Sequence, residues 1–194
     1  QRYMMYGPEF IARTTLSNDA LKALTSEQLL AKVRSLMGKQ HEVLYYGPQP
    51  QKELQSTLAA YHKVEGELAP LEKKFARPLL TDKNEVLLAQ YDAKQLYYLQ
   101  YSNRGEKFDL AADPVITLYN EYFGGSMNAV VFQEMREARG LAYSASAWLS
   151  TPSFADGSYS YLAFIATQND KMQQAIEAFD EIINDMPESE AAFQ

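Results

Sequence analysis

Several kinds of residue are missing or scarce in this 194-residue chain, and each shortage excludes a class of function. Cysteine is absent, which excludes disulfides, thiolate catalysis and cysteine-based metal sites. Asp and Glu number 25 against 18 Lys and Arg, a net charge of −7, so we expect no nucleic-acid partner. No apolar run approaches the roughly 20 residues that a membrane span requires. We therefore expect a soluble protein, and the cytoplasm and the periplasm of a bacterium both fit this composition.

Histidine is also scarce, because His41 and His62 are the only two imidazoles. Neither lies in an H-E-x-x-H or H-x-x-E-H motif, and neither has a second ligand at helical spacing. A protein zinc site needs several N, S or O ligands that converge on the metal. We interpret both histidines as surface or structural residues, and we predict no metal site in this chain.

What remains is the composition of an ordinary globular protein, 46% hydrophobic and 22% charged. The chain starts at Gln1 rather than at a methionine, and Glu188 to Gln194 form no closing element, so we expect a piece of a longer protein. No serine lies in G-x-S-x-G. Gly124 to Met127 resemble a phosphate loop only loosely, since the lysine of such a loop is missing, and a sharp turn is the favoured interpretation.

The stretch from Gly124 to Ser150, GGSMNAVVFQEMREARGLAYSASAWLS, organises the second half of the chain. We expect a helix that Ser126 caps and Gly140 ends, with a strand directly afterwards. Because the turn at Gly140 is tight, we predict that Arg136 and Tyr143 point into one space.

These two side chains have a possible chemistry. A guanidinium offers five fixed donors and a phenol offers one, so Arg136 and Tyr143 together can hold a peptide backbone and stabilise an oxyanion. Spacing alone favours a plainer interpretation, in which Arg136 stabilises the C-terminal end of the helix and Tyr143 is a half-buried strand residue.

The remaining periodicity predicts elements along the whole chain. The expected helices are 17–24, 25–37, 51–64, 113–123 and 170–185, and the expected strands are 41–46, 84–91, 94–102, 142–149 and 158–167. Thr25 and Gln28 form a capping box, and the leucines that follow are expected to face inward. After a proline-containing linker at 66–83, two strands precede two helices, two strands and a helix. This order predicts an α+β fold, an α/β sandwich with a mostly antiparallel sheet and helices packed on one face.

The central stretch carries a family resemblance. YFGGSMNAVVFQEMREARGLAYSASA resembles the second-domain signature of the M16 family of zinc metallopeptidases. LSNDALKALTSEQLLAKV and HEVLYYGPQPQKELQSTLAAYHKV resemble the end of the M16 domain before it. By this resemblance, residues 1–65 end one M16-like domain, 66–83 are a linker, and 84–194 are a second domain that is truncated at its C-terminus.

The resemblance implies a function. In M16 enzymes two halves close around a peptide, and an H-x-x-E-H helix in the first domain carries the zinc. The other half supplies an Arg and a Tyr, which match Arg136 and Tyr143 and would act as the catalytic and substrate-binding pair. Arg139 belongs to the motif with a packing role or a role near the substrate. The zinc would be bound outside this chain, by a zinc-carrying half on the same or another chain, so this chain alone should be inactive.

Two other interpretations stay open. Some M16 members are catalytically silent halves or scaffold subunits, and an H-x-x-E-H about one domain upstream of Gln1 would distinguish an enzyme from a scaffold. An unrelated ligand-binding α/β domain would require the motif match to be accidental.

Overall fold

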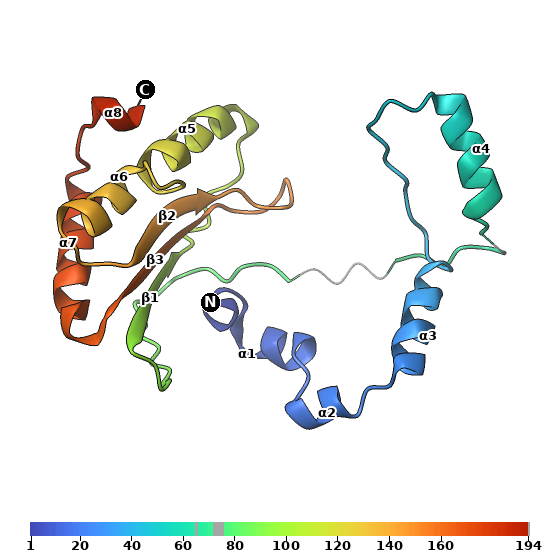
Figure 1. Ribbon diagram of the computed structural model, residues 1–194, viewed down its shortest axis with the longest axis horizontal. Helices are drawn as coiled ribbons and strands as arrows, with labels where there is room; N and C mark the ends of the chain where they lie inside the picture. The colour runs from blue at the N-terminus through green and yellow to red at the C-terminus, as the bar shows by residue number, and fades with distance from the viewer. Residues whose placement is uncertain (65, 72–75, 194) are drawn as a thin grey trace. The chain divides into compact units, whose positions relative to one another are not determined.

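The computed structural model of the protein describes residues 1–64, 66–71 and 76–193 (Figure 1). The chain divides into two compact units. The sheet unit comprises Gln1–Ile11 and Ala76–Gln194, and the helical unit comprises Ala12–Phe75. Each unit is described by itself.

The sheet unit is built on a three-stranded antiparallel sheet. Its strands are β1 (Gln95–Ser102), β2 (Ser144–Ser150) and β3 (Ser160–Gln168), in the order β1-β3-β2. The central strand pairs Ile165 with Tyr98 on one side and with Ala145 on the other. On this face, the buried residues of β2 and β3 are small or branched, namely Ala145, Ala147, Ala163 and Ile165, and they leave room for helices to pack closely.

Helical segments cover this one face of the sheet (Figure 1). They are α5 (Asp113–Phe123), α6 (Val130–Phe132), the π-helix η2 (Gln133–Ala138) and α7 (Met172–Asn184). The shorter pieces are η1 (Leu110–Ala112), η3 (Asn169–Lys171) and α8 (Glu190–Phe193). The core between helices and sheet contains Phe123, Val130, Val131, Met135, Ala145, Ala147, Ala163, Ile165, Ala175, Ala178, Phe179 and Ile182. The predicted α+β class, an antiparallel sheet with helices on one face, is confirmed.

Tyrosines extend this core. Tyr98, Tyr119 and Tyr161 pack against it, and burial raises the pKa of each phenol above its ordinary value. For Tyr161, the neighbouring Tyr119 and Tyr98 add to the effect of burial. The hydroxyl of Tyr161 is buried without a hydrogen-bond partner among the described residues.

The strand predicted at 84–91, and its hairpin to β1, are wrong. These residues form no strand, and Leu88 is 95% exposed. A strand is stable only when it pairs with another, and among the described residues β1 pairs with β3 alone. The segment therefore has strand-forming residues without a partner.

The helical unit contains α2 (Asn18–Lys22), α3 (Ser26–Leu36) and α4 (Gln51–Tyr61). The predicted caps are confirmed: the Ala20 amide donates to Ser17 Oγ at 3.1 Å. Thr25 and Gln28 form the reciprocal capping box, with bonds of 2.9 and 3.3 Å. Both helices begin at the predicted residues, because a cap is an interaction between residues close in sequence.

The predicted inward faces of these helices are wrong. Leu29, Leu30, Val33 and Leu36 are all exposed, and none of the described residues of the helical unit is buried. The strand predicted at 41–46 is also absent, and only a single bridge between Lys39 and Ala69 forms nearby. An amphipathic helix buries its apolar face only where a second layer covers it.

The N-terminal residues, for which the sequence predicted no element, are helical. Helix α1 (Arg2–Thr14) is kinked at Gly7, whose φ of 78° is the left-handed conformation that glycine tolerates. Within the sheet unit, the Leu79 amide donates to the Met5 carbonyl at 2.7 Å.

The predicted linker at 66–83 lies partly on residues 72–75, outside the described residues. The assignment of 1–65 and 84–194 to two family domains stays a prediction, because a compact unit does not reveal the family domain from which its residues come. No helix within the described residues is long and apolar enough to cross a membrane.

Candidate functional site

A glycine corner precedes the site. A Cβ on Gly124 would clash with the Ala147 carbonyl oxygen, so the backbone of β2 passes too close for any other residue. The Ala147 amide also donates to the Gly124 carbonyl at 3.4 Å. The expected sharp turn is present, but Ser126 does not cap the helix, because α6 starts only at Val130 and its N-cap is Ala129.

Asn120 fixes this corner to the edge of the sheet. Its side-chain amide donates to the Leu149 carbonyl at 2.9 Å, and the Leu149 amide donates back to Asn120 Oδ1 at 2.7 Å. Its own carbonyl accepts from the Gly125 amide at 2.7 Å. The Asn120 side chain thus makes the pair of hydrogen bonds that a neighbouring strand would make with the Leu149 backbone, and it holds α5 against β2.

The helix that carries Arg136 is a π-helix in its second half, which the sequence did not predict. The Arg139 amide donates to the Glu134 carbonyl, and the Leu141 amide to the Met135 carbonyl, at 3.1 and 2.8 Å. Such widened turns are rare and frequently lie at functional sites. Gly140 then ends the helix in the left-handed conformation, at φ 59°, as predicted.

The structure brings Arg136 and Tyr143 together. The Arg136 guanidinium lies over the Tyr143 ring at 5.5 Å and over the Phe132 ring at 5.1 Å. Tyr143 precedes β2, and its amide donates to the Ala166 carbonyl at 2.8 Å, which fixes its backbone. Cation–π contacts of this kind orient a guanidinium without occupying its N–H groups.

Both side chains are accessible. Tyr143 is 68% exposed, and its hydroxyl makes no hydrogen bond to a described residue. The Arg136 side chain is 43% exposed, and its Nε lies 3.5 Å from a Glu137 carboxylate oxygen. The plainer interpretation of Tyr143 as a half-buried strand residue is therefore wrong. The pair presents donors to solvent.

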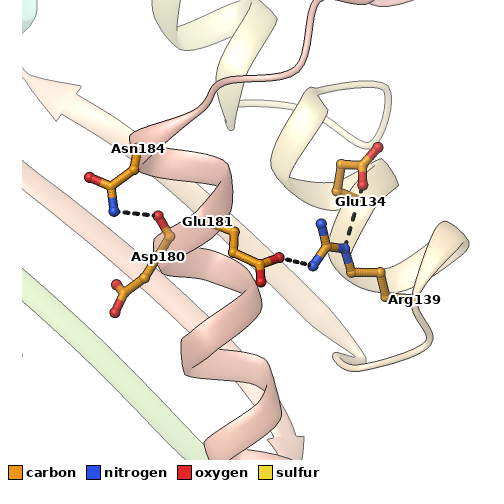
Figure 2. A network of polar contacts seen from close by, with 5 residues as sticks. All are labelled: Glu134, Arg139, Asp180, Glu181 and Asn184. Atoms are coloured by element: carbon orange, nitrogen blue, oxygen red, sulfur yellow. Dashed lines mark hydrogen bonds and ion pairs between the residues drawn. The ribbon is translucent and has the colours of Figure 1, made fainter.

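Arg139 makes a different set of contacts (Figure 2). Its Nη1 donates to Glu181 Oε2 on α7 at 2.7 Å, and its Nε lies 3.6 Å from Glu134 Oε2. The hydrogen bond that Arg139 donates to Glu181 is the main cause that raises the pKa of Arg139. Arg139 therefore ties the π-helix to α7, which agrees with the packing role that the sequence suggested.

A hollow of about 960 Å³ lies beside Arg139, and neither Arg136 nor Tyr143 lines it. Its walls are Arg139, Glu177, Asp180, Glu181, Ile182, Asn184, Asp185, Met186, Pro187 and Glu188. Five of these side chains are carboxylates, and Arg139 is their one basic neighbour. The Arg136–Tyr143 pair thus lies on an open surface and not in this hollow.

A metal centre of three or more ligands is absent from the part of the chain that the structure describes. His41 and His62, which the sequence separates, nevertheless lie side by side in the helical unit, with their Nε2 atoms 2.6 Å apart.

The comparison with known families agrees with the motif around this pair. The sequence model of the family described as "Peptidase M16 inactive domain" matches residues 24–191, most of the chain. The chain belongs to the M16 peptidase family. The match includes the central motif, so its resemblance to M16 is confirmed at the level of the family. The description of the matched domain type calls it inactive.

Solved structures show the same fold. The crystal structure of a peptidase M16 inactive domain from Pseudomonas fluorescens is similar over 97% of this M16 chain, with a TM-score of 0.57 and 14% sequence identity. The chain covers 46% of that protein, so it spans about half of its length. No curated protein matches the sequence.

Sequence reasoning missed three contributors to the site. Phe132 lies four residues before Arg136, and this helical spacing was a usable signal for their contact. The other two are the hydrogen bonds of Asn120 to Leu149 and the ion pair of Arg139 with Glu181. They join segments far apart in sequence, so no local sequence pattern predicts them.

Proposed function

We propose that this chain is the substrate-binding, zinc-free portion of an M16-type zinc metalloendopeptidase, to which it contributes Arg136 and Tyr143. The observation that carries the proposal is the contact between the guanidinium and the phenol ring, 5.5 Å apart, on an exposed surface at the end of a π-helix. Two rigid donors in one accessible place suit an extended peptide, whose carbonyls all need partners.

The two side chains have separate roles. The Arg136 N–H groups bind a backbone carbonyl of the peptide and orient it, because the two aromatic rings hold the guanidinium plane. The Tyr143 hydroxyl donates to the oxyanion that develops when the scissile carbonyl is attacked. The zinc of such an enzyme supplies metal-assisted hydrolysis from a domain outside this chain, since no group of three ligands occurs among the residues described here.

This function also requires a zinc-carrying half. We propose that residues 1–65 are the end of a preceding M16-like domain, that 66–83 link it to the domain at 84–194, and that the zinc-carrying half belongs to the same or another chain. The peptide substrate then lies between that half and the surface of Arg136 and Tyr143.

The substitution Tyr143→Phe in the complete enzyme tests this role. It removes one donor from the oxyanion, which typically lowers kcat by about 100- to 1,000-fold. The melting temperature should hardly change, because the Tyr143 side chain is largely exposed. Turnover of a fluorogenic peptide and a thermal melt of the same preparation give both numbers.

Tyr97→Phe is the matched control. Tyr97 is also an exposed tyrosine of the sheet unit, on β1, and its substitution should leave turnover at the wild-type level. If Tyr143→Phe and Tyr97→Phe are equally active, Tyr143 has no catalytic role.

A catalytically silent half is the second candidate function. Both the matched family and the Pseudomonas fluorescens protein carry the description "inactive domain". In this case the chain only pairs with a partner, and the assembled protein cleaves no peptide. A library of peptides incubated with the zinc-loaded full-length protein distinguishes the two candidates, because cleavage that chelation abolishes supports the enzyme.

A further inference from the structure

The chain's two histidines meet in the helical unit. The Nε2 atoms of His41 and His62 are 2.6 Å apart, and their rings are perpendicular, at 89°, with centroids 4.8 Å apart. His41 is exposed and His62 is half-buried. Two nitrogens that are common metal ligands thus converge at a surface that solvent reaches.

The backbone fixes both residues from separate directions. The Gln40 amide donates to the Ala69 carbonyl at 2.9 Å, and this bridge places the residue that follows, His41. His62 ends α4, where its amide donates to the Leu58 carbonyl at 2.8 Å. The pair is therefore built by secondary structure and not by the histidines' own contact alone.

The tautomer of His41 suits a ligand. Its Nδ1 lies 2.6 Å from the Lys39 carbonyl oxygen, which can only accept, so Nδ1 carries a proton. In the neutral ring the Nε2 lone pair is then free to accept, here from the Nε2–H of His62. Metal-binding histidines almost always donate their other N–H to a carbonyl or carboxylate in this way.

The separation of the two nitrogens is closer to one coordination geometry than to another. With metal–nitrogen bonds of about 2.0–2.1 Å, ligands at 90° lie roughly 2.9 Å apart, and tetrahedral ligands lie roughly 3.3 Å apart. The observed 2.6 Å needs to open by only a few tenths of an ångström for the first geometry and by about twice as much for the second. Square-planar nitrogen sites are typical of Cu²⁺ and Ni²⁺.

We propose that His41 and His62 form a two-histidine chelate for Cu²⁺ or Ni²⁺ in the helical unit. The ion replaces the proton that the two Nε2 atoms share, and His62 changes to the tautomer with a proton on Nδ1. A hollow of about 530 Å³ lies next to His41 and is also lined by Gln40, Glu42, Pro70 and Leu71. Water completes the coordination, because the described residues offer no cluster of three ligands.

The test is calorimetric titration of the untagged chain with Cu²⁺ and with Ni²⁺ in a buffer that binds neither. We expect one ion per chain. His41→Gln and His62→Gln each remove one of two linked ligands, and losing such linkage lowers affinity by about 100-fold or more. The glutamine substitutions keep size and polarity, and far-UV circular dichroism checks that α4 persists.

Glu42→Gln is the matched control, because Glu42 lines the same hollow and is not a ligand in the proposal. It should bind the ion within a factor of two of the wild type, and the Cu²⁺ electron paramagnetic resonance spectrum should show two nitrogen ligands in both proteins. Unchanged binding in the variant that lacks both histidines would overturn the proposal. Single variants that lose affinity only twofold would overturn it too, since the histidines would then act independently.

Discussion

Both units of this chain contain amphipathic helices, but apolar side chains of these helices are buried in the sheet unit, and none is buried in the described part of the helical unit. In the sheet unit, Phe179 on α7 is 0% exposed, and the helices around it share one core with the sheet. In the helical unit, Leu30 on α3 is 52% exposed, although α3 has the better N-cap of the two helices. The difference shows that caps decide where a helix begins, whereas a second layer decides whether it contributes to a core.

The same comparison bears on how firmly a functional side chain can be positioned. The sheet unit can hold a side chain in place from several directions, as Ala166 and Phe132 do for Tyr143 and Arg136. A site on such a scaffold keeps its geometry without a bound ligand. The proposed peptide-binding pair belongs to this unit.

Truncating one apolar side chain in each unit should give the largest contrast. Phe179→Ala leaves a cavity in the core and should lower the free energy of unfolding by about 3–5 kcal/mol. Leu30→Ala changes an exposed position and should stay within about 0.5 kcal/mol. Urea denaturation followed by far-UV circular dichroism, which reports the helices of both units, measures both. Equal losses would show that α3 has a core of its own.

Substituting two glycines of the sheet unit compares the cost of a steric clash with the cost of backbone strain. Gly124→Ala puts a methyl group against the Ala147 backbone, so we expect a loss of about 1–3 kcal/mol or more. In Gly140→Ala the new methyl group enters open space, so the only cost is that alanine must adopt the left-handed conformation. We expect this to lower the free energy of unfolding by about 1–2 kcal/mol. Thermal melts of the two variants should rank in this order. The reverse order would mean that the corner at Gly124 relaxes freely.

Tyr161→Phe should have the smallest effect at neutral pH and a visible one in alkali. Burial raises the pKa of Tyr161, so the free energy of unfolding is highest below the ordinary phenol pKa of about 10 and falls as pH rises above it. Phenylalanine cannot ionise, so the fall with pH should be shallower in the variant. Near pH 7 the change should be neutral or slightly stabilising, because the buried hydroxyl has no partner among the described residues.

Tyr61→Phe in the helical unit is the comparison for this pH series. Tyr61 is 87% exposed, so the variant removes a phenol hydroxyl outside any core and should unfold like the wild type throughout the series. Matching profiles for Tyr161→Phe and wild type between pH 9 and 11 would contradict the raised pKa.

The sequence predicted most of what depends on near neighbours, although Ser126 does not cap the helix that follows it. Ser17, Thr25 and Gly140 mark helix ends through contacts within a few residues, and each was placed correctly. The family motif likewise lies in one continuous stretch. These features need no knowledge of the rest of the fold.

Features that depend on distant partners were predicted less well. Residues 84–91 have the composition of a strand, but pairing decides whether a strand forms. The π-helix at Gln133–Ala138 differs from an α-helix in that its backbone hydrogen bonds span five residues instead of four, and it has no compositional signal. His41 and His62 meet only because the Lys39–Ala69 bridge and α4 converge.

The central claim is that Arg136 and Tyr143 act on one peptide. A double-mutant cycle of Arg136→Met, Tyr143→Phe and the double variant in the full-length enzyme tests it through kcat/KM. We expect each single variant to lose about 100-fold or more, and the double variant to lose clearly less than the product, because the two groups act as a unit. Losses that multiply in the double variant, or wild-type kcat/KM in all three variants, would contradict the account.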